Sequence, residues 1–403
     1  MPLAASDRES IAFKPEATFG TVAGTGNYYA LRMNSEALKY DLTTKKSEEI
    51  VDDRTVRDLI LVDASASGPV PCEFSYGEYD WLIQALLATT ISNVVGTNGS
   101  HVATGTVTIS ATGVTLATGA PFASCESGQW IRVSNASSSG NNKLVQITGI
   151  LGTGTGFSVA SGTFTAETGT GVITFQGARF KNGSTLRTFS IERKNADLNG
   201  GTGLYECFRG MAVDKWSLSF QPGSILGQQY EFIGKDSLPM STGRALPGTG
   251  VSSLTNSILN SVDSVSNIYE GGSLLTSTYV RQMTLNVMNN MEPVKAVGNL
   301  GAVDLRLGKF NAQLSLQLYL DSETYYNKFR NNTSTSFSVR LTDQAGNAYV
   351  ITLPRADYSS AERPNPGRNQ MIILNAQIEA LRDPTTGLAF VIDRCGAAVT
   401  PWA

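Results

Sequence analysis

The chain has 403 residues, and its 31 lysines and arginines are nearly balanced by 34 aspartates and glutamates, for a formal net charge of −3. This balance argues against a protein that binds nucleic acid through its phosphates, because such binding needs a basic surface. It does not exclude a protein that DNA passes without binding to it. The N-terminal stretch has no basic segment before an apolar run, and no window approaches 18 apolar residues. We therefore expect neither a signal peptide nor a membrane-spanning helix.

The first predicted elements are a strand, a long loop, a second strand and a helix. The loop covers residues 45–68, and the second strand is VPCEFSYG. The helix covers 78–89 and carries one apolar stripe at helical spacing, formed by Trp81, Leu82, Ala85 and Leu86. Such a stripe is more typical of a helix that packs on a sheet than of a cofactor site.

The next segment, residues 92–183, differs in composition from the rest of the chain. It is rich in Gly, Ser, Thr and Val, is poor in charge, and reads as five or six short strands separated by turns. This pattern indicates a small all-β module inserted into the first half. A disordered low-complexity linker is the alternative, but the recurring β-branched runs and Trp130 favour the folded module.

The remaining elements are mostly half-buried strands, because apolar and polar residues alternate with a period of two. They are a hairpin at 188–210, a strand at 214–221, a second loop at 289–308, a strand at 309–320, a helix at 321–332, a hairpin at 336–355 and a strand at 373–381. One face of these strands carries amides and hydroxyls with little charge, at Ser217, Ser219, Gln313, Ser315, Gln317, Asn375, Gln377 and Glu379. A solvated sheet face usually carries more Lys and Glu.

The two halves of the chain repeat one order of elements: strand, long loop, strand, helix, then a hairpin that opens with Phe-Ser and a β-branched residue. We therefore predict a mainly β (α+β) fold in which one β-sandwich or barrel unit, with one helix per copy, is duplicated. The first unit comprises residues 1–91 and 184–250. The small β module at 92–183 is inserted into it, and the second unit is 251–403.

The residue types that carry chemistry are scarce or scattered. The four cysteines, Cys72, Cys125, Cys207 and Cys395, have no metal-type spacing, and we expect buried, inert thiols. The single histidine, His101, excludes a two-histidine metal site and reads as a surface-loop residue. The pair Asp52 and Asp53 could hold a cation or act as acid and base, although a solvated loop explains it more simply. We therefore predict no catalytic residue, no metal site, no cofactor and no enzymatic activity.

At this level of detail the sequence resembles a known family, the tail tube (major tail) proteins of long-tailed, non-contractile bacteriophages. The start, FKPEATFGTVAG, is similar to that family, as is the run KSEEIVDDRTVRDLILVDASASGPVPCEFSYGEYDWLIQALL. FKNGSTLRTFSIERK with LYECFRGMAVDKWSLSF looks like the central block of the family, and GQWIRVSN with VITFQG looks like a small module often inserted there. The second half, from TLNVMNN to FSVRLTDQAGNAYVITLPR, follows the same scheme.

The resemblance implies a structural role in the virion. Proteins of this family form rings that stack into a hollow tube joining the capsid to the host-adhesion tip, and DNA leaves through that tube. The implied partners are other copies of the chain, a tape measure protein and a tail terminator. DNA would pass without specific binding, no membrane would be involved, and the protein would be made in the host cytoplasm. From the residues alone, a cell-surface or carbohydrate-binding β protein remains the alternative, and a hydrolase lacks a constellation of residues.

Three expectations concern assembly. The eight polar positions named above are expected to face the lumen, with a solvated outer face as the alternative. The loops at 45–68 and 289–308 mix apolar residues with charges of both signs, so we expect them to reach the adjacent ring through polar contacts of Asp53, Arg54 and Arg57; disorder is the alternative. Because the unit is duplicated, we expect a homotrimeric ring with pseudo-sixfold walls. The alternative is a homohexamer in which the two halves form one larger sandwich.

Overall fold

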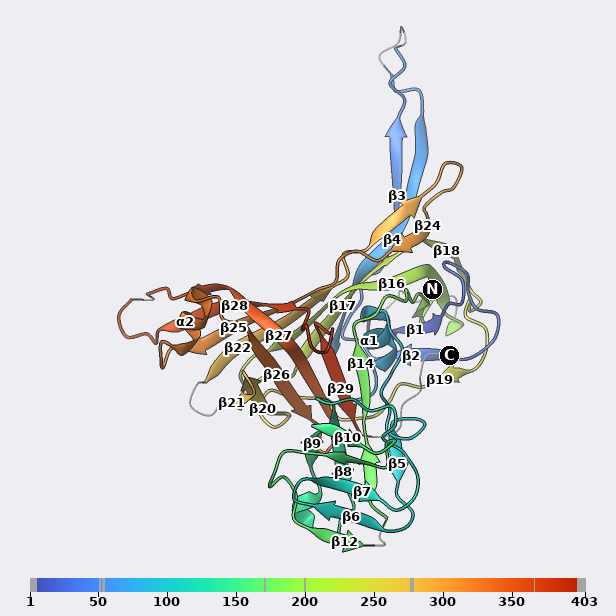
Figure 1. The fold of residues 1–403 in the computed structure, drawn as a ribbon. Helices are drawn as coiled ribbons and strands as arrows, with labels where there is room; N and C mark the ends of the chain where they lie inside the picture. The colour runs from blue at the N-terminus through green and yellow to red at the C-terminus, as the bar shows by residue number, and fades with distance from the viewer. Residues whose placement is uncertain are drawn as a thin grey trace.

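The computed structural model describes residues 6–50, 52, 55–169, 172–198, 201–275, 279–365 and 367–396. Its body consists of β-sheets, with a long hairpin projecting at one end and a small β module at the other (Figure 1). The described residues hold two α-helices and two short 3-10 helices: α1 (Asp80–Leu86), α2 (Thr324–Arg330), η1 (Ser6–Arg8) and η2 (Ser139–Asn141). The prediction of a mainly β fold is confirmed.

Eight antiparallel strands in the described residues form what we call the broad sheet, which extends across both halves of the chain. In order of pairing they are β3 (Lys39–Lys46), β4 (Leu59–Glu73), β17 (Gly227–Gly234), β16 (Leu204–Phe220), β22 (Val280–Met288), β25 (Asn311–Tyr319), β28 (Ile373–Leu381) and β27 (Ala348–Glu362). The first four strands come from the first half and the last four from the second. In each set a hairpin is followed by a third strand and then by a long strand, so the order of strands repeats.

The two long strands, β16 and β27, belong to the broad sheet only along their C-terminal parts. Their N-terminal parts belong to a second layer. There β16 pairs with β15 (Phe189–Asn195) and β18 (Asp236–Ser241), beside β1 (Glu9–Pro15), β2 (Tyr28–Leu31) and β19 (Gly250–Val251). In the same way β27 pairs with β26 (Thr335–Thr342) and β29 (Val391–Cys395), beside β20 (Val265–Glu270), β21 (Ser273–Leu274) and β14 (Ala178–Lys181). Register shifts at Val213/Lys215 and Tyr358/Ser360 mark irregularities in the long strands, which bend a strand locally.

The main hydrophobic core draws side chains from the broad sheet and the second layer, and both halves of the chain contribute to it. Alternation along the broad sheet points Trp216, Leu285 and Leu314 into this core, while Phe189 and Phe337 enter it from the second layer. Each such burial stabilises the fold by about 1.5–3 kcal/mol. Helix α1 is almost wholly buried and contacts β16, whereas α2 contacts β27 and has no fully buried residue.

The inserted segment folds as a module with its own core, which favours the folded reading over a disordered linker. A five-stranded sheet contains β10 (Gly149–Leu151), β11 (Gly156–Ser158), β7 (Gly113–Leu116), β6 (Val107–Ser110) and β12 (Glu167–Gly169); a four-stranded sheet contains β5 (Ser100–Val102), β13 (Thr174–Gln176), β8 (Trp130–Ser134) and β9 (Leu144–Gln146). Phe122, Phe157 and Phe175 meet edge to face at the centre, with centroids 4.9–6.0 Å apart. The described residues thus hold nine short strands rather than five or six, and His101 lies half-buried in β5 rather than in a surface loop.

The module is fixed to the second half of the chain through β29. Alternate residues of this strand face opposite ways: Ile392 belongs to the main core, whereas Asp393 accepts hydrogen bonds from Arg179 and from the Trp130 N–H. Leu144 of the module also packs with Ala348 and Cys395 of the second layer. The second layer therefore separates the module from the main core, and the core separates it from the broad sheet.

Candidate functional site

The polar residues singled out from the sequence lie together on one face of the broad sheet. Gln313 lies opposite Glu379, Ser315 opposite Gln377, and Gln317 opposite Asn375. Ser217 and Ser219 of β16 join the same rows through β22. We call this surface, opposite the core, the polar face.

Several members of the polar face were missed at the sequence level. They are Gln282, Thr284 and Asn286 on β22, Gln229 and Glu231 on β17, and Asp357 on β27. Lys215, which alternates with Ser217 and Ser219 on β16, also lies on this face. The alternation in RQMTLNVM over 281–288 carries the same signal as the strands that were recognised. The eight predicted residues are half-buried rather than fully exposed, which follows from the close spacing of side chains on a continuous sheet.

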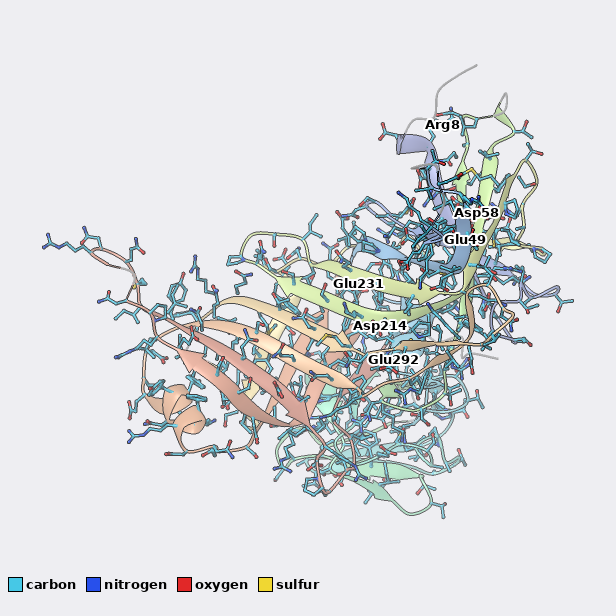
Figure 2. The ribbon with its side chains drawn as sticks, turned by 90° about the horizontal axis from the view of Figure 1, so that it is seen from above. Arg8, Glu49, Asp58, Asp214, Glu231 and Glu292 are labelled. Carbon is cyan, nitrogen blue, oxygen red and sulfur yellow. The ribbon has the colours of Figure 1, made fainter. Side chains whose placement is uncertain are left out.

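Neighbouring side chains on the polar face form hydrogen bonds and ion pairs with one another. The Ser315 hydroxyl donates to Gln377 Oε1 at 2.7 Å, and Lys215 Nζ lies 2.9 Å from Glu231 Oε2. In the view from above, Glu231 lies on the broad sheet (Figure 2). With few charges and a slight excess of carboxylates, this surface offers few cations to a polyanion.

The first predicted loop forms a projecting hairpin. Strands β3 and β4 extend well beyond the rest of the sheet (Figure 1), and we call their outer part, residues 42–62, the arm. Arg57 is exposed, and its guanidinium lies 3.9 Å from the Glu49 carboxylate. Glu49 and Asp58 lie close together in the view from above (Figure 2). Asp53 and Arg54 lie outside the described residues. Apolar side chains on the arm are exposed at Leu42, Ile50, Val56, Leu59, Ile60, Leu61 and Val62.

The second predicted loop also forms a hairpin, β23 (Glu292–Lys295) with β24 (Ala302–Arg306). It lies beside the base of the arm (Figure 1), where Lys295 forms an ion pair with Asp63 of β4. This ion pair lowers the pKa of Asp63. The hairpin exposes Val294, Val297, Leu300 and Val303. The structure thus brings together two loops that are more than 200 residues apart in the sequence, and both present apolar surface.

A buried charged group ties α1 to the second half of the chain. Asp80, in the first turn of α1, accepts hydrogen bonds from the Tyr349 hydroxyl at 2.5 Å and from Arg394 Nε at 2.7 Å. Burial raises the pKa of Asp80, and the charge of Arg394 opposes that rise. The Arg394 guanidinium also lies 4.6 Å from the ring centroid of Tyr76. Because the Asp80 carboxylate is paired with Arg394 and accepts the Tyr349 hydroxyl, we interpret this group as structural rather than catalytic.

The four cysteines lie in environments that keep them inert. All four cysteines are free and buried, and burial raises the pKa of Cys72, Cys125 and Cys207 to about 12, which keeps these thiols protonated. No group of three or more potential metal ligands occurs in the described residues. Within that part of the chain, no helix has the length and apolar character needed to cross a membrane.

These features define a structural β protein with a continuous polar face and with exposed apolar residues on the arm and on the β23–β24 hairpin. The family model described as phage tail tube protein matches residues 6–380. The chain therefore belongs to the phage tail tube protein family, which gives it a structural role in the virion tail, in self-assembly with other tail components. A comparison with curated proteins found no match.

Proposed function

We propose that copies of this chain form rings that stack into a hollow tube, through which DNA leaves the capsid during ejection. The main support for this proposal is that the broad sheet has two open edges. In the described residues β3 pairs only with β4, and the C-terminal part of β27 pairs only with β28. Open edges of this kind invite aggregation in a lone subunit. A ring that joins them closes one continuous barrel and removes them.

The polar face lines the lumen of this tube. Its Gln, Asn and Ser side chains keep the wall wet, and its scarce, slightly acidic charge gives phosphates few cations to bind. The core and the second layer lie behind the broad sheet, and the inserted module lies behind them. The module therefore stands on the outer surface of the tube.

Three chains complete one ring. Each chain supplies the repeating set of strands twice, so three chains supply six sets and give a pseudo-sixfold wall. A ring of six whole chains would double the circumference for the same strand pairing. The inserted module occurs once per chain, so each ring carries three modules.

The arm and the β23–β24 hairpin contact the adjacent ring. Their exposed apolar residues and mixed charges suit an interface that is buried on stacking. Asp53, Arg54 and Arg57 at the arm supply polar contacts there. Further partners are a tape measure protein within the lumen and a terminator at the end of the tube. The protein is made in the host cytoplasm and acts without enzymatic chemistry.

Negative-stain microscopy of the concentrated, purified protein tests this function. We expect rings and tubes whose abundance rises with concentration. Dispersed particles at every concentration would contradict the proposal and would favour a cell-surface or carbohydrate-binding role.

A further inference from the structure

The two halves of the chain are joined by pairing between β16 and β22. The equivalent pairing, at the free edge of β27, is not made among the described residues of a single subunit. Inside the chain β16 pairs with β22, from Lys215 opposite Met288 to Phe220 opposite Met283. The equivalent strand of the second half is β27, and the equivalent of β22 is the segment that leads into β3. In a single subunit these two segments lie at opposite edges of the broad sheet.

The repeated strands can be matched residue by residue. Trp216, Tyr230 and Val70 form one cross-strand row on the core face. Tyr358, Ile378 and Leu314 form the corresponding row in the second half. One step along each strand, the row Lys215, Glu231 and Pro69 corresponds to Asp357, Glu379 and Gln313.

The same matching fixes the residues at the opposite edge. Ala37 N–H donates to Pro69 O at 3.0 Å, and Asn286 lies opposite Gln313. Since Pro69 corresponds to Gln313, Ala37 corresponds to Asn286, and the next two residues, Leu38 and Lys39, correspond to Val287 and Met288. Both Leu38 and Val287 are buried.

We propose that residues 34–40 of one copy pair antiparallel with residues 356–363 of a second copy, with Lys39 opposite Asp357 and Leu38 opposite Tyr358. This inference rests on the proposed ring and specifies its interface. It repeats between chains the register that Met288 and Val287 make with Lys215 and Trp216 inside the chain.

The charges at the two edges are complementary. Asp357 lies directly opposite Glu379, and like charges in that position destabilise a sheet. Within the described residues neither carboxylate forms an ion pair, and Asp357 Oδ1 is buried without a hydrogen-bond partner. In the first half the equivalent of Asp357 is Lys215, which pairs with Glu231. Lys39, which forms an exposed ion pair with Asp41 in the free subunit, supplies from a second copy the cation that the second half lacks.

A second charge match lies further along the same edges. The register shift between Tyr358 and Ser360 adds one residue to β27, and continuing the register past it places the exposed Arg363 opposite Asn34. Asn34 lines a cavity of about 640 Å³ that is also lined by four acidic residues, Asp7, Glu9, Glu36 and Glu73, and by one basic residue, Arg32. The guanidinium of one copy therefore reaches the acidic cavity of the next.

In the free subunit, side chains occupy the edge that the second copy would use. Leu38 N–H donates to Glu36 Oε2 at 2.6 Å, and Arg193 donates to Leu38 O. By the equivalence with Val287, these two backbone groups are the ones that face Tyr358 of the second copy. Protecting an edge in this way reduces unwanted pairing before assembly.

Cysteine cross-linking tests the register. Asn289 N–H donates to Asp214 O at 2.8 Å, so the adjacent pair Lys215 and Met288 is a non-hydrogen-bonded pair, with Cα atoms about 4.5 Å apart. That spacing suits a disulfide. The variant Lys39→Cys/Asp357→Cys should therefore give covalent multimers up to a trimer on mild oxidation of assembled protein. Asp41→Cys/Asp357→Cys, two residues out of register on the same face, should give few, and Lys215→Cys/Met288→Cys should cross-link within one chain.

Charge reversal gives a second measurement that does not depend on oxidation. Lys39→Glu alone should reduce tube formation, and adding Asp357→Lys should restore it. If tubes form and the Asp41 variant cross-links instead, or if charge reversal has no effect, the register is wrong although the tube function stands. If wild-type protein forms no tubes, the proposed function itself fails.

Discussion

Arg179 and Asp393 lie 214 residues apart in the chain and form a buried two-point ion pair, with Nε 2.7 Å from Oδ1 and Nη2 2.9 Å from Oδ2. Arg179 belongs to β14, the strand of the second layer that follows the last strand of the module's own sheets, and Asp393 belongs to β29 of the second half. Arg179 Nη2 also donates to Gly128 O of the module at 2.9 Å. The pair therefore holds together three parts of the chain.

Breaking this pair should be costly. The substitution Asp393→Asn leaves the buried Arg179 guanidinium with only the partly exposed Glu126, 3.6 Å from Nη1, as a countercharge, and we expect the free energy of unfolding to fall by about 3 kcal/mol. Urea denaturation measures the change. The matched control is Glu292→Gln, which removes an exposed ion pair with Arg306 and should change stability by less than about 1 kcal/mol. Equal effects of the two substitutions would show that the buried pair does not hold the fold.

Glu36 should make the stability of the free subunit depend on pH. Burial, and then the hydrogen-bonded contact with Glu9, raise the pKa of Glu36 from 4.5 to about 7, against the charge of Arg193. Because the folded-state pKa is above the unfolded value, this contribution to stability is fully present below about pH 4.5 and is lost as pH rises through about 7. The melting temperature should therefore decrease from pH 5 to pH 8 in the wild type and less so in Glu36→Gln. Identical pH profiles for the two proteins would rule out Glu36 as the cause.

Cations introduced into the polar face should retard DNA. Lysine substitutions at Gln313 and Gln317 place two positive charges per chain beside Ser315 in the lumen and leave the core-facing residues unchanged. We expect normal assembly and slower DNA ejection, because phosphates gain partners to bind. Ejection kinetics measured on intact particles test this, with Ser266→Lys, exposed on β20 of the second layer, as a control for added charge. Unchanged ejection in the Gln313/Gln317 variant would place the polar face outside the DNA path.

Charge reversal at the arm should separate ring formation from stacking. The double substitution Arg54→Glu/Arg57→Glu should give rings that fail to stack, because it removes two cations from the proposed contact with the adjacent ring. Electron microscopy distinguishes single rings from tubes. Full-length tubes from this variant would remove these arginines from the stacking interface.

The alternation of apolar and polar residues was enough to predict β25, β28 and the part of β16 that lies in the broad sheet, and the shared face of residues such as Gln313 and Gln377. It could not show that Thr284 and Asn286 complete the rows between β16 and β25, because strand neighbours are set by tertiary pairing. Short strands such as Ser100–Val102 carry too few residues for a periodic signal, which explains why His101 was placed in a loop. The helices are shorter than predicted at both ends, although Tyr79 and Leu87, which flank α1, are buried in the main core.

The contacts that organise the molecule were beyond prediction from sequence. Arg179 with Asp393, Lys295 with Asp63, and Arg193 with Leu38 each join residues that are far apart in the chain. No local pattern marks such partners, because each charged residue alone looks like an ordinary surface charge and a backbone acceptor such as Leu38 O carries no sequence signal. The two long loops were expected to share a role, and the structure explains how they can, since both form hairpins on the same side of the broad sheet.

The central claim is that three chains close a ring whose lumen is lined by the polar face. A cryo-electron microscopy reconstruction of the assembled tube tests it most directly. We predict three chains per ring, a pseudo-sixfold wall with Gln313, Ser315 and Gln377 facing the lumen, and three inserted modules on the outside. A true sixfold ring carrying six outer modules, or a lumen lined by another face, would contradict the account.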